Sequence, residues 1–207
     1  MKGGLSRVRI GGEPMSGVPE DPIWRMNTDR YHQMFEAGVL TEDDPVELLE
    51  GWLVEKVRKT PQHSMVTGLM RRELERLTKP GFFVAAHDPF TTEDSEPEPD
   101  GTVVRGEPKN YADHHPGPKD IALVVEISDA TLQRDRTIKL RIYARAAIPI
   151  FWIVNLIDGH IEVYADPTGP AEQPTYRQRT DFGPADDVPL IINGREIGRI
   201  AVRDILP

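Results

Sequence analysis

The stretch Asp120-Ile-Ala-Leu-Val-Val-Glu126-Ile127 decides the fold, because it is the most apolar segment of the chain and does not alternate between polar and apolar residues. Such a run is typical of a central strand that is covered on both faces. Residues 131–147 then have helical spacing, and a second apolar run covers residues 148–155. The order strand, helix, strand predicts a β-α-β crossover with two parallel strands, and therefore an α/β fold.

The flanking segments predict further elements on both sides of this unit. A helix should begin at a cap, Asn27 or Thr28, and end at Gly38. Two short apolar runs around Glu50-Gly51 predict a β-hairpin over residues 46–57. The other predicted elements are an amphipathic helix over 61–77, strands over 81–90, 100–105, 161–164 and 175–178, and a last helical turn over 202–206.

The length of 207 residues suits one domain with a hydrophobic core, and we expect this domain to span residues 27–207. Residues 1–26 carry glycines and prolines without an amphipathic period, so we predict a flexible N-terminal tail. The sequence shows no signal peptide and no apolar run of the ~20 residues that cross a bilayer. A cytoplasmic protein without membrane contact is the expectation.

Composition limits the chemistry that the chain can carry. The absence of cysteine excludes disulfides, thiolate metal sites and a cysteine nucleophile, so any metal must be held by oxygen or imidazole. The formal net charge of -9 argues against a protein that coats nucleic acid nonspecifically, because such binding depends on basic side chains.

Five polar residues around the central strand form the most informative pattern. Asp100 begins one strand, Glu126 lies late in the central strand, and Asp135, Lys139 and Tyr143 follow at intervals of four on one face of the next helix. Two neighbouring carboxylates repel each other unless a cation lies between them, so this pair suits Mg²⁺ or Mn²⁺. Lys139 could reach back to orient a water molecule or stabilise a developing anion.

This pattern resembles the PD-(D/E)xK nuclease superfamily and, within it, the bacterial Uma-type restriction endonuclease family, long filed as a domain of unknown function. The resemblance implies a restriction-endonuclease-like core: a mixed central β-sheet flanked by α-helices, with an N-terminal helix and a β-hairpin. It also implies that Asp100 and Glu126 are metal ligands and that Glu47 is a further acidic residue of the site. The segments that carry the resemblance are residues 46–51, 61–63, 98–100, 124–128, 148–154, and Asp135 with Lys139 and Tyr143.

Two residues depart from the pattern of these nucleases. Ser128 stands where the lysine of a (D/E)xK motif belongs, and the family resembled here typically takes its lysine from the next helix, which makes Lys139 the candidate. Glu50 stands where the family usually has aspartate before the glycine.

Structural roles compete with the functional ones at several of these positions. Glu47 could face solvent, Asp135 and Lys139 could form an exposed ion pair, and His63 could be a helix cap, a packing residue or a residue at the rim of the site. We expect Trp52 and Trp152 to lie in the core and the acidic loop over 93–100 to be a solvated linker. Adjacent histidines at 114 and 115 rarely bind one ion.

The sequence therefore predicts a Mg²⁺-dependent endonuclease that hydrolyses DNA through a metal-activated water. The alternative is a nuclease fold without catalysis that serves as a binding or interaction module, and a homodimer is expected in either case. A hydrolase for a small phosphorylated molecule would suit the acidic charge, but the sequence has no glycine-rich phosphate loop to support it.

Overall fold

A computed structural model describes residues 24–207. The predicted tail over residues 1–26 lies outside the described residues except for its last three, of which Met26 donates a backbone hydrogen bond to Gly51 (3.1 Å). None of the described helices has the length and apolar character that a membrane span requires.

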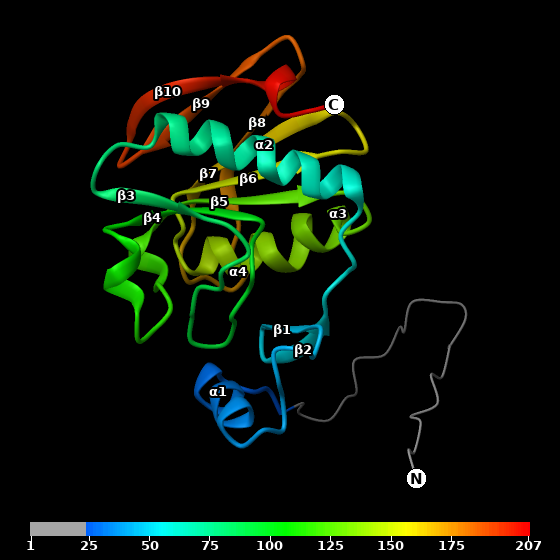
Figure 1. Cartoon of the computed structure of the whole chain (residues 1–207), viewed down its shortest axis with the longest axis vertical. Helices are drawn as coiled ribbons and strands as arrows, with labels where there is room; N and C mark the ends of the chain where they lie inside the picture. Colours follow the sequence, from blue (N-terminus) through cyan, green and yellow to red (C-terminus); the bar gives the residue numbers. More distant parts are fainter. Residues whose placement is uncertain (1–23) are drawn as a thin grey trace.

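The central feature is a six-stranded mixed sheet in the order β3-β4-β5-β6-β7-β8 (Figure 1). Its strands are β3 (Phe82–Ala85), β4 (Gly101–Arg105), β5 (Ile121–Ser128), β6 (Ile150–Asn155), β7 (His160–Pro167) and β8 (Tyr176–Phe182). Within this sheet β5 and β6 pair in parallel, and every other neighbouring pair is antiparallel. The predicted α/β fold with a mixed sheet and a β-α-β crossover is confirmed.

Helices cover the two faces of this sheet. Figure 1 shows α2 (Pro61–Leu77) on one side of the sheet, and α3 (Leu132–Arg134) and α4 (Leu140–Arg145) on the other. Between α3 and α4 the chain forms one π-helical turn, η3 (Asp135–Lys139), so the helix predicted over 131–147 is continuous but locally widened. α1 (Thr28–Glu36) begins at the predicted cap, where the Asn27 side chain accepts from the Arg30 N–H.

Strand β5 divides its side chains between two hydrophobic cores. Leu123, Val125 and Ile127 pack with α2, whereas Val124 packs with α4. Because successive strand residues point to opposite faces, Glu126 lies on the same face as Val124, beneath the helical segment that carries Lys139. The alternation of side chains along β5 therefore directs Glu126 toward Lys139.

Two hairpins lie beside the sheet. β1 (Val46–Leu49) pairs with β2 (Trp52–Glu55), as predicted, but Trp52 is 44% exposed, so its expected place in the core is wrong. β9 (Asp187–Ile192) and β10 (Arg195–Ala201) form a second hairpin that the sequence reading missed, and it covers the α2 side. The strand predicted over 81–90 is shorter, since only Phe82–Ala85 pairs with β4.

Candidate functional site

The predicted site residues gather around one pocket between the sheet, the first hairpin and the two helical layers. Its lining includes the six residues Glu47, His63, Asp100, Glu126, Asp135 and Lys139. Their elements are far apart in the sequence, so only the fold brings them together. All six are buried, which rules out a solvent-facing Glu47 and an exposed pair of Asp135 with Lys139.

Asp100 precedes β4 and lies against the end of β5. Its Oδ2 atom accepts from the backbone N–H of Ile127 (2.9 Å) and lies 3.1 Å from Nε2 of His63. Burial raises the pKa of this carboxyl, but the hydrogen bonds from His63 and Ile127 and the charge of Lys59 lower it to about 2. Asp100 is therefore a fixed, ionised carboxylate at neutral pH.

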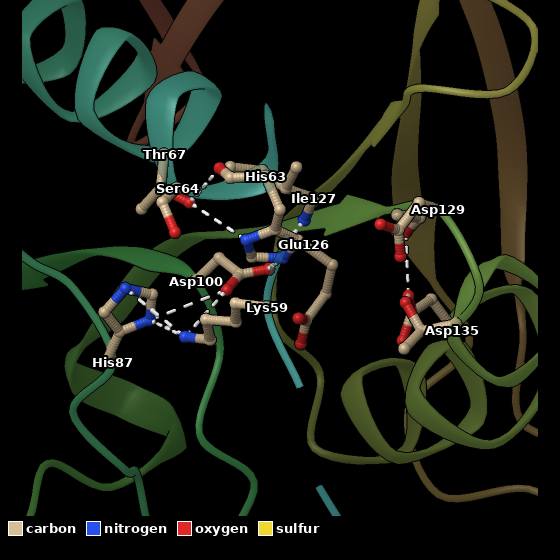
Figure 2. Close-up of polar contacts among 12 residues, drawn as sticks. Lys59, His63, Ser64, Thr67, His87, Asp100, Glu126, Ile127, Asp129 and Asp135 are labelled. Atoms are coloured by element: carbon tan, nitrogen blue, oxygen red, sulfur yellow. Dashed lines mark hydrogen bonds and ion pairs between the residues drawn. The ribbon is translucent and has the colours of Figure 1, made fainter. Parts of the chain in front are cut away.

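Two residues that the sequence reading did not select also contact Asp100. Lys59 Nζ lies 3.3 Å and His87 Nδ1 3.5 Å from Oδ1 of Asp100, and Lys59 donates to Nδ1 of His87 (Figure 2). His87 has a positive φ of 62°, which is uncommon outside glycine, and its backbone N–H donates to Pro99 (3.1 Å). The basic run over 56–59, just before the predicted helix, is the sequence signal that could have pointed to Lys59.

Glu126 is bound by two donors from the helical layer above it. Its Oε1 atom accepts from Lys139 Nζ (2.9 Å) and from the Tyr143 hydroxyl (2.5 Å). Burial raises the pKa of Glu126 to about 8, and the nearby carboxylates of Asp135 and Asp100 add to this rise while Lys139 opposes it. Asp100 and Glu126 line the same pocket.

Lys139 lies beside two buried carboxylates, those of Glu126 and Glu47. Besides Glu126, its Nζ atom lies 3.4 Å from Oε2 of Glu47, which also accepts from the backbone N–H of Glu98 (3.3 Å). Burial lowers the pKa of Lys139, but the surrounding carboxylates raise it above its ordinary value. Lys139 is one of several basic groups beside the pocket carboxylates, since Lys59 lies 3.3 Å from Asp100 and Arg134 lies 3.8 Å from Glu47.

Ser128, at the position of the lysine in a (D/E)xK motif, has a structural role. The side chain of Ser128 is fully buried and donates to Oδ2 of Asp135 (2.7 Å), which also accepts from the Thr131 hydroxyl (2.6 Å). A lysine at this position would replace a fully buried side chain and lose the hydrogen bond to Asp135. The Oδ1 atom of Asp135 is buried without a hydrogen-bond partner in the part of the chain that the structure describes.

The π-helical turn that carries Lys139 is anchored by its neighbour Arg136. Arg136 Nε donates to Oε1 (3.1 Å) and Oε2 (3.2 Å) of Glu162 on β7, and Glu162 is fully buried. Glu162 pairs with Ile153 across the sheet, and Ile153 pairs with Glu126, so the two glutamates lie two strands apart on one face. Single π turns are frequent at functional sites.

Glu50, the second departure from the family pattern, has a structural role. Glu50 lies in the turn of the first hairpin with a φ of 49°, and its carboxylate accepts from Nε of Arg141 (2.8 Å) and Nη2 of Arg145 (2.6 Å) on α4. Gly51 follows with a φ of 80°, and a Cβ atom there would lie 2.5 Å from Arg25 Cβ. The turn thereby fixes the hairpin that carries Glu47.

The loop over 93–100 is not the solvated linker that its acidity suggests. Ser95 and Glu96 are buried, and Glu96 bridges to Leu48 on β1. By contrast, His114 lies in an exposed loop, with Nδ1 2.6 Å from Oδ1 of the adjacent Asp113.

The donors present fit a hard divalent cation that keeps much of its water. Within residues 24–207, no three side chains of His, Cys, Asp or Glu converge as a ready metal cluster. Mg²⁺ is usually held by one or two carboxylates together with waters and substrate phosphates, and Asp100 with Glu126 meets that requirement. Both line the same pocket, and no hydrogen bond within the described residues engages Oε2 of Glu126.

Comparison with known proteins identifies the family of the chain. The family model described as "Putative restriction endonuclease" (Uma2) matches residues 28–195, and the chain belongs to this family. A solved structure of a putative nuclease of the DUF820 family from Anabaena variabilis matches with a TM-score of 0.64 and 16% identity, covering 87% of this chain and 97% of that chain. At this identity the likeness shows a shared fold. No curated protein matches the chain. The resemblance inferred from the sequence is confirmed, and a nuclease-like function is supported.

Proposed function

We propose that this protein is a divalent-metal-dependent endonuclease that hydrolyses phosphodiester bonds of DNA. The observation that carries the proposal is the convergence of Asp100, Glu126 and Lys139 on one pocket, from two strands and a helix. Family membership supports a nucleic-acid substrate.

The contacts of each residue suggest its role in the proposed reaction. Asp100, ionised and fixed by His63 and Ile127, and Glu126, with Oε2 available, would hold Mg²⁺ or Mn²⁺. When bound, the cation would lower the pKa of an attacking water and offset charge on the phosphate. Lys139 holds a proton beside Glu126 and would orient the attacking water or stabilise the developing anion, while Tyr143 fixes the Glu126 carboxylate.

Glu47, Asp135 and His63 have supporting positions in this proposal. Glu47 and Asp135 keep Lys139 charged, since both raise its pKa. His63 orients Asp100 from the first turn of α2. A homodimer and a cytoplasmic location stay predictions from the sequence, and light scattering in solution would check the first.

Plasmid nicking with Mg²⁺ or Mn²⁺ tests the proposal. We expect Asp100→Asn and Glu126→Gln to abolish nicking and EDTA to stop it, while the exposed matched controls Asp43→Asn and Glu42→Gln keep it. Circular dichroism confirms that each variant is folded. Full nicking by Asp100→Asn would refute the assignment.

The same variants distinguish an active nuclease from the alternative, a nuclease fold without catalysis that serves as a binding or interaction module. The net charge of -9 and the protein donors on both oxygens of Asp100 favour that alternative. A chain that neither nicks DNA nor shows Asp100-dependent heat on titration with Mn²⁺ would be such a module.

A further inference from the structure

The two oxygens of Asp100 are held by groups of very different exposure. Oδ2 is bound by the backbone of Ile127 and by His63, whose side chain is 9% exposed. Oδ1 faces Lys59 and His87, whose side chains are 41% and 42% exposed (Figure 2). One side of the carboxylate is therefore fixed by the fold, and the other is held by groups that can move into solvent.

Lys59 lies in a segment that suits such movement. Residues 56–60 connect β2 to α2 without regular structure, and Lys56, Arg58 and Lys59 all line the pocket. Lys56 is paired with Glu98 (2.5 Å), whereas Arg58 has no ion-pair partner within the described residues. In a chain with a net charge of -9, this run concentrates positive charge beside the carboxylates.

We propose that Lys59 is a tethered counter-ion, which pairs with Asp100 in the absence of a divalent cation and moves to a substrate phosphate when a cation binds Oδ1. This inference rests on the proposed function, because it assumes that Asp100 is a cation ligand and that the substrate is a phosphodiester. Lys59 is a positioning residue in this proposal, and it couples binding of the divalent cation to binding of the substrate phosphate.

The charge of Lys59 and the exposure of its side chain support its movement from Asp100 to a substrate phosphate. An ammonium group 3.3 Å from Oδ1 and a divalent cation on the same oxygen repel each other strongly in a partly buried site. An ion pair with an exposed lysine is easily broken, and the flexible stem of lysine lets the charge find a new anion. A phosphate at the pocket mouth gives Lys59 that anion, so phosphate and cation should each strengthen binding of the other by the same factor.

Calorimetric titration with Mn²⁺ in the absence of DNA tests whether Lys59 competes with the cation for Asp100. Lys59→Met removes the competing charge, so we expect Mn²⁺ to bind about fivefold more tightly than to the wild type. Lys59→Arg keeps the charge and should bind as the wild type does. Lys109→Met is the matched control, since Lys109 is exposed and pairs with Glu107 outside the pocket.

Fluorescence anisotropy of a labelled DNA duplex tests whether Lys59 strengthens DNA binding when a cation is present. Ca²⁺ takes the same hard oxygen ligands and serves as the cation in this assay. In the wild type we expect Ca²⁺ to strengthen DNA binding by about fivefold or more, and in Lys59→Met we expect this gain to be largely lost. The unfolding midpoint of Lys59→Met should stay near that of the wild type, because the side chain is exposed.

The outcomes separate this inference from the proposed function. Tighter Mn²⁺ binding by Lys59→Met together with a smaller gain from Ca²⁺ supports the exchange. Equal Mn²⁺ affinity in Lys59→Met and wild type, with binding still lost in Asp100→Asn, overturns the role of Lys59 and leaves the metal site standing. Absence of Asp100-dependent Mn²⁺ binding in both proteins overturns the exchange and the proposed function together.

Discussion

The Nζ atom of Lys139 lies 2.9 Å from Oε1 of Glu126, although one residue belongs to a π-helical turn and the other to the central strand. Both side chains are about 4% exposed. A buried ion pair of this kind contributes little net stability when complete, but removal of one partner leaves an uncompensated charge. The pair therefore links the stability of the core to the chemistry of the site.

At pH 9, above the pKa of Glu126 of about 8, Lys139→Met should destabilise the protein by about 3–5 kcal/mol, because Glu126 and Glu47 lose their shared ammonium, and the variant should not nick DNA. Unfolding in guanidinium chloride measures the first effect. In the double variant Lys139→Met/Glu126→Gln one unpaired carboxylate is gone, so part of the stability should return while activity stays absent. A single variant as stable as the wild type would contradict the dependence of these carboxylates on Lys139.

Asp100→Asn should lose stability in a pH-dependent way. The pKa of Asp100 is about 2 in the folded protein against an ordinary 3.8, so its ionised form stabilises the fold above pH 3.8, and this contribution is lost as the pH falls through about 2. We expect the wild type to exceed the variant by about 2 kcal/mol at pH 6 and by much less near pH 2. Urea unfolding across this range checks it, with Asp43→Asn as a surface control. A difference that does not vary with pH would contradict the charged contacts of Asp100.

Much of the fold follows from local sequence. The unbroken apolar run of β5, the helix after it and the apolar run of β6 predict the crossover, because each signal is contained in its own segment. Trp52 and the hairpin β9-β10 could not be predicted in the same way. Exposure of Trp52 depends on what packs over β2, whereas β9 contains a proline and β10 contains a glycine and charged residues, which weaken a strand pattern.

Residues that line the pocket could be selected from the sequence, but their contacts could not. Asp100, Glu126 and Lys139 follow from family spacing, yet the same spacing of Asp135 and Lys139 would also suit an exposed ion pair, and no local signal reveals the π turn that buries both. Lys59 and His87 are 28 residues apart and meet at Asp100 only because the first hairpin, α2 and the loop before β4 converge there.

Tyr143→Phe should weaken cation binding most at neutral pH. Burial raises the pKa of Glu126 to about 8, and the Tyr143 hydroxyl, 2.5 Å away, opposes that rise. A cation must displace the Glu126 proton below this pKa, so Mn²⁺ affinity should increase with pH up to about 8. Without the hydroxyl the pKa rises further, and we expect about tenfold weaker binding at pH 7.

Calorimetry at pH 7 and pH 9, in buffers with different heats of protonation, measures both the affinity and the protons released. The deficit of Tyr143→Phe should shrink at pH 9, where Glu126 is ionised in the wild type. Tyr111→Phe, which changes a hydroxyl that donates to Arg105 outside the pocket, is the control. An equal deficit at both pH values would show that Tyr143 acts through packing alone.

Arg136→Met should destabilise the fold and displace Lys139, because Arg136 anchors the π turn to a fully buried glutamate on β7. Glu162 would keep hydrogen bonds from Asn155 (3.0 Å) and Tyr164 (2.6 Å) but lose its main cation, at a cost of about 3 kcal/mol. Hydrogen exchange should speed up at the amides of the π turn, and nicking should slow at temperatures where the variant is folded. Arg199→Met removes an exposed pair with Glu196 and should change neither. Normal exchange at the turn in Arg136→Met would mean that packing, and not this ion pair, places Lys139 over Glu126.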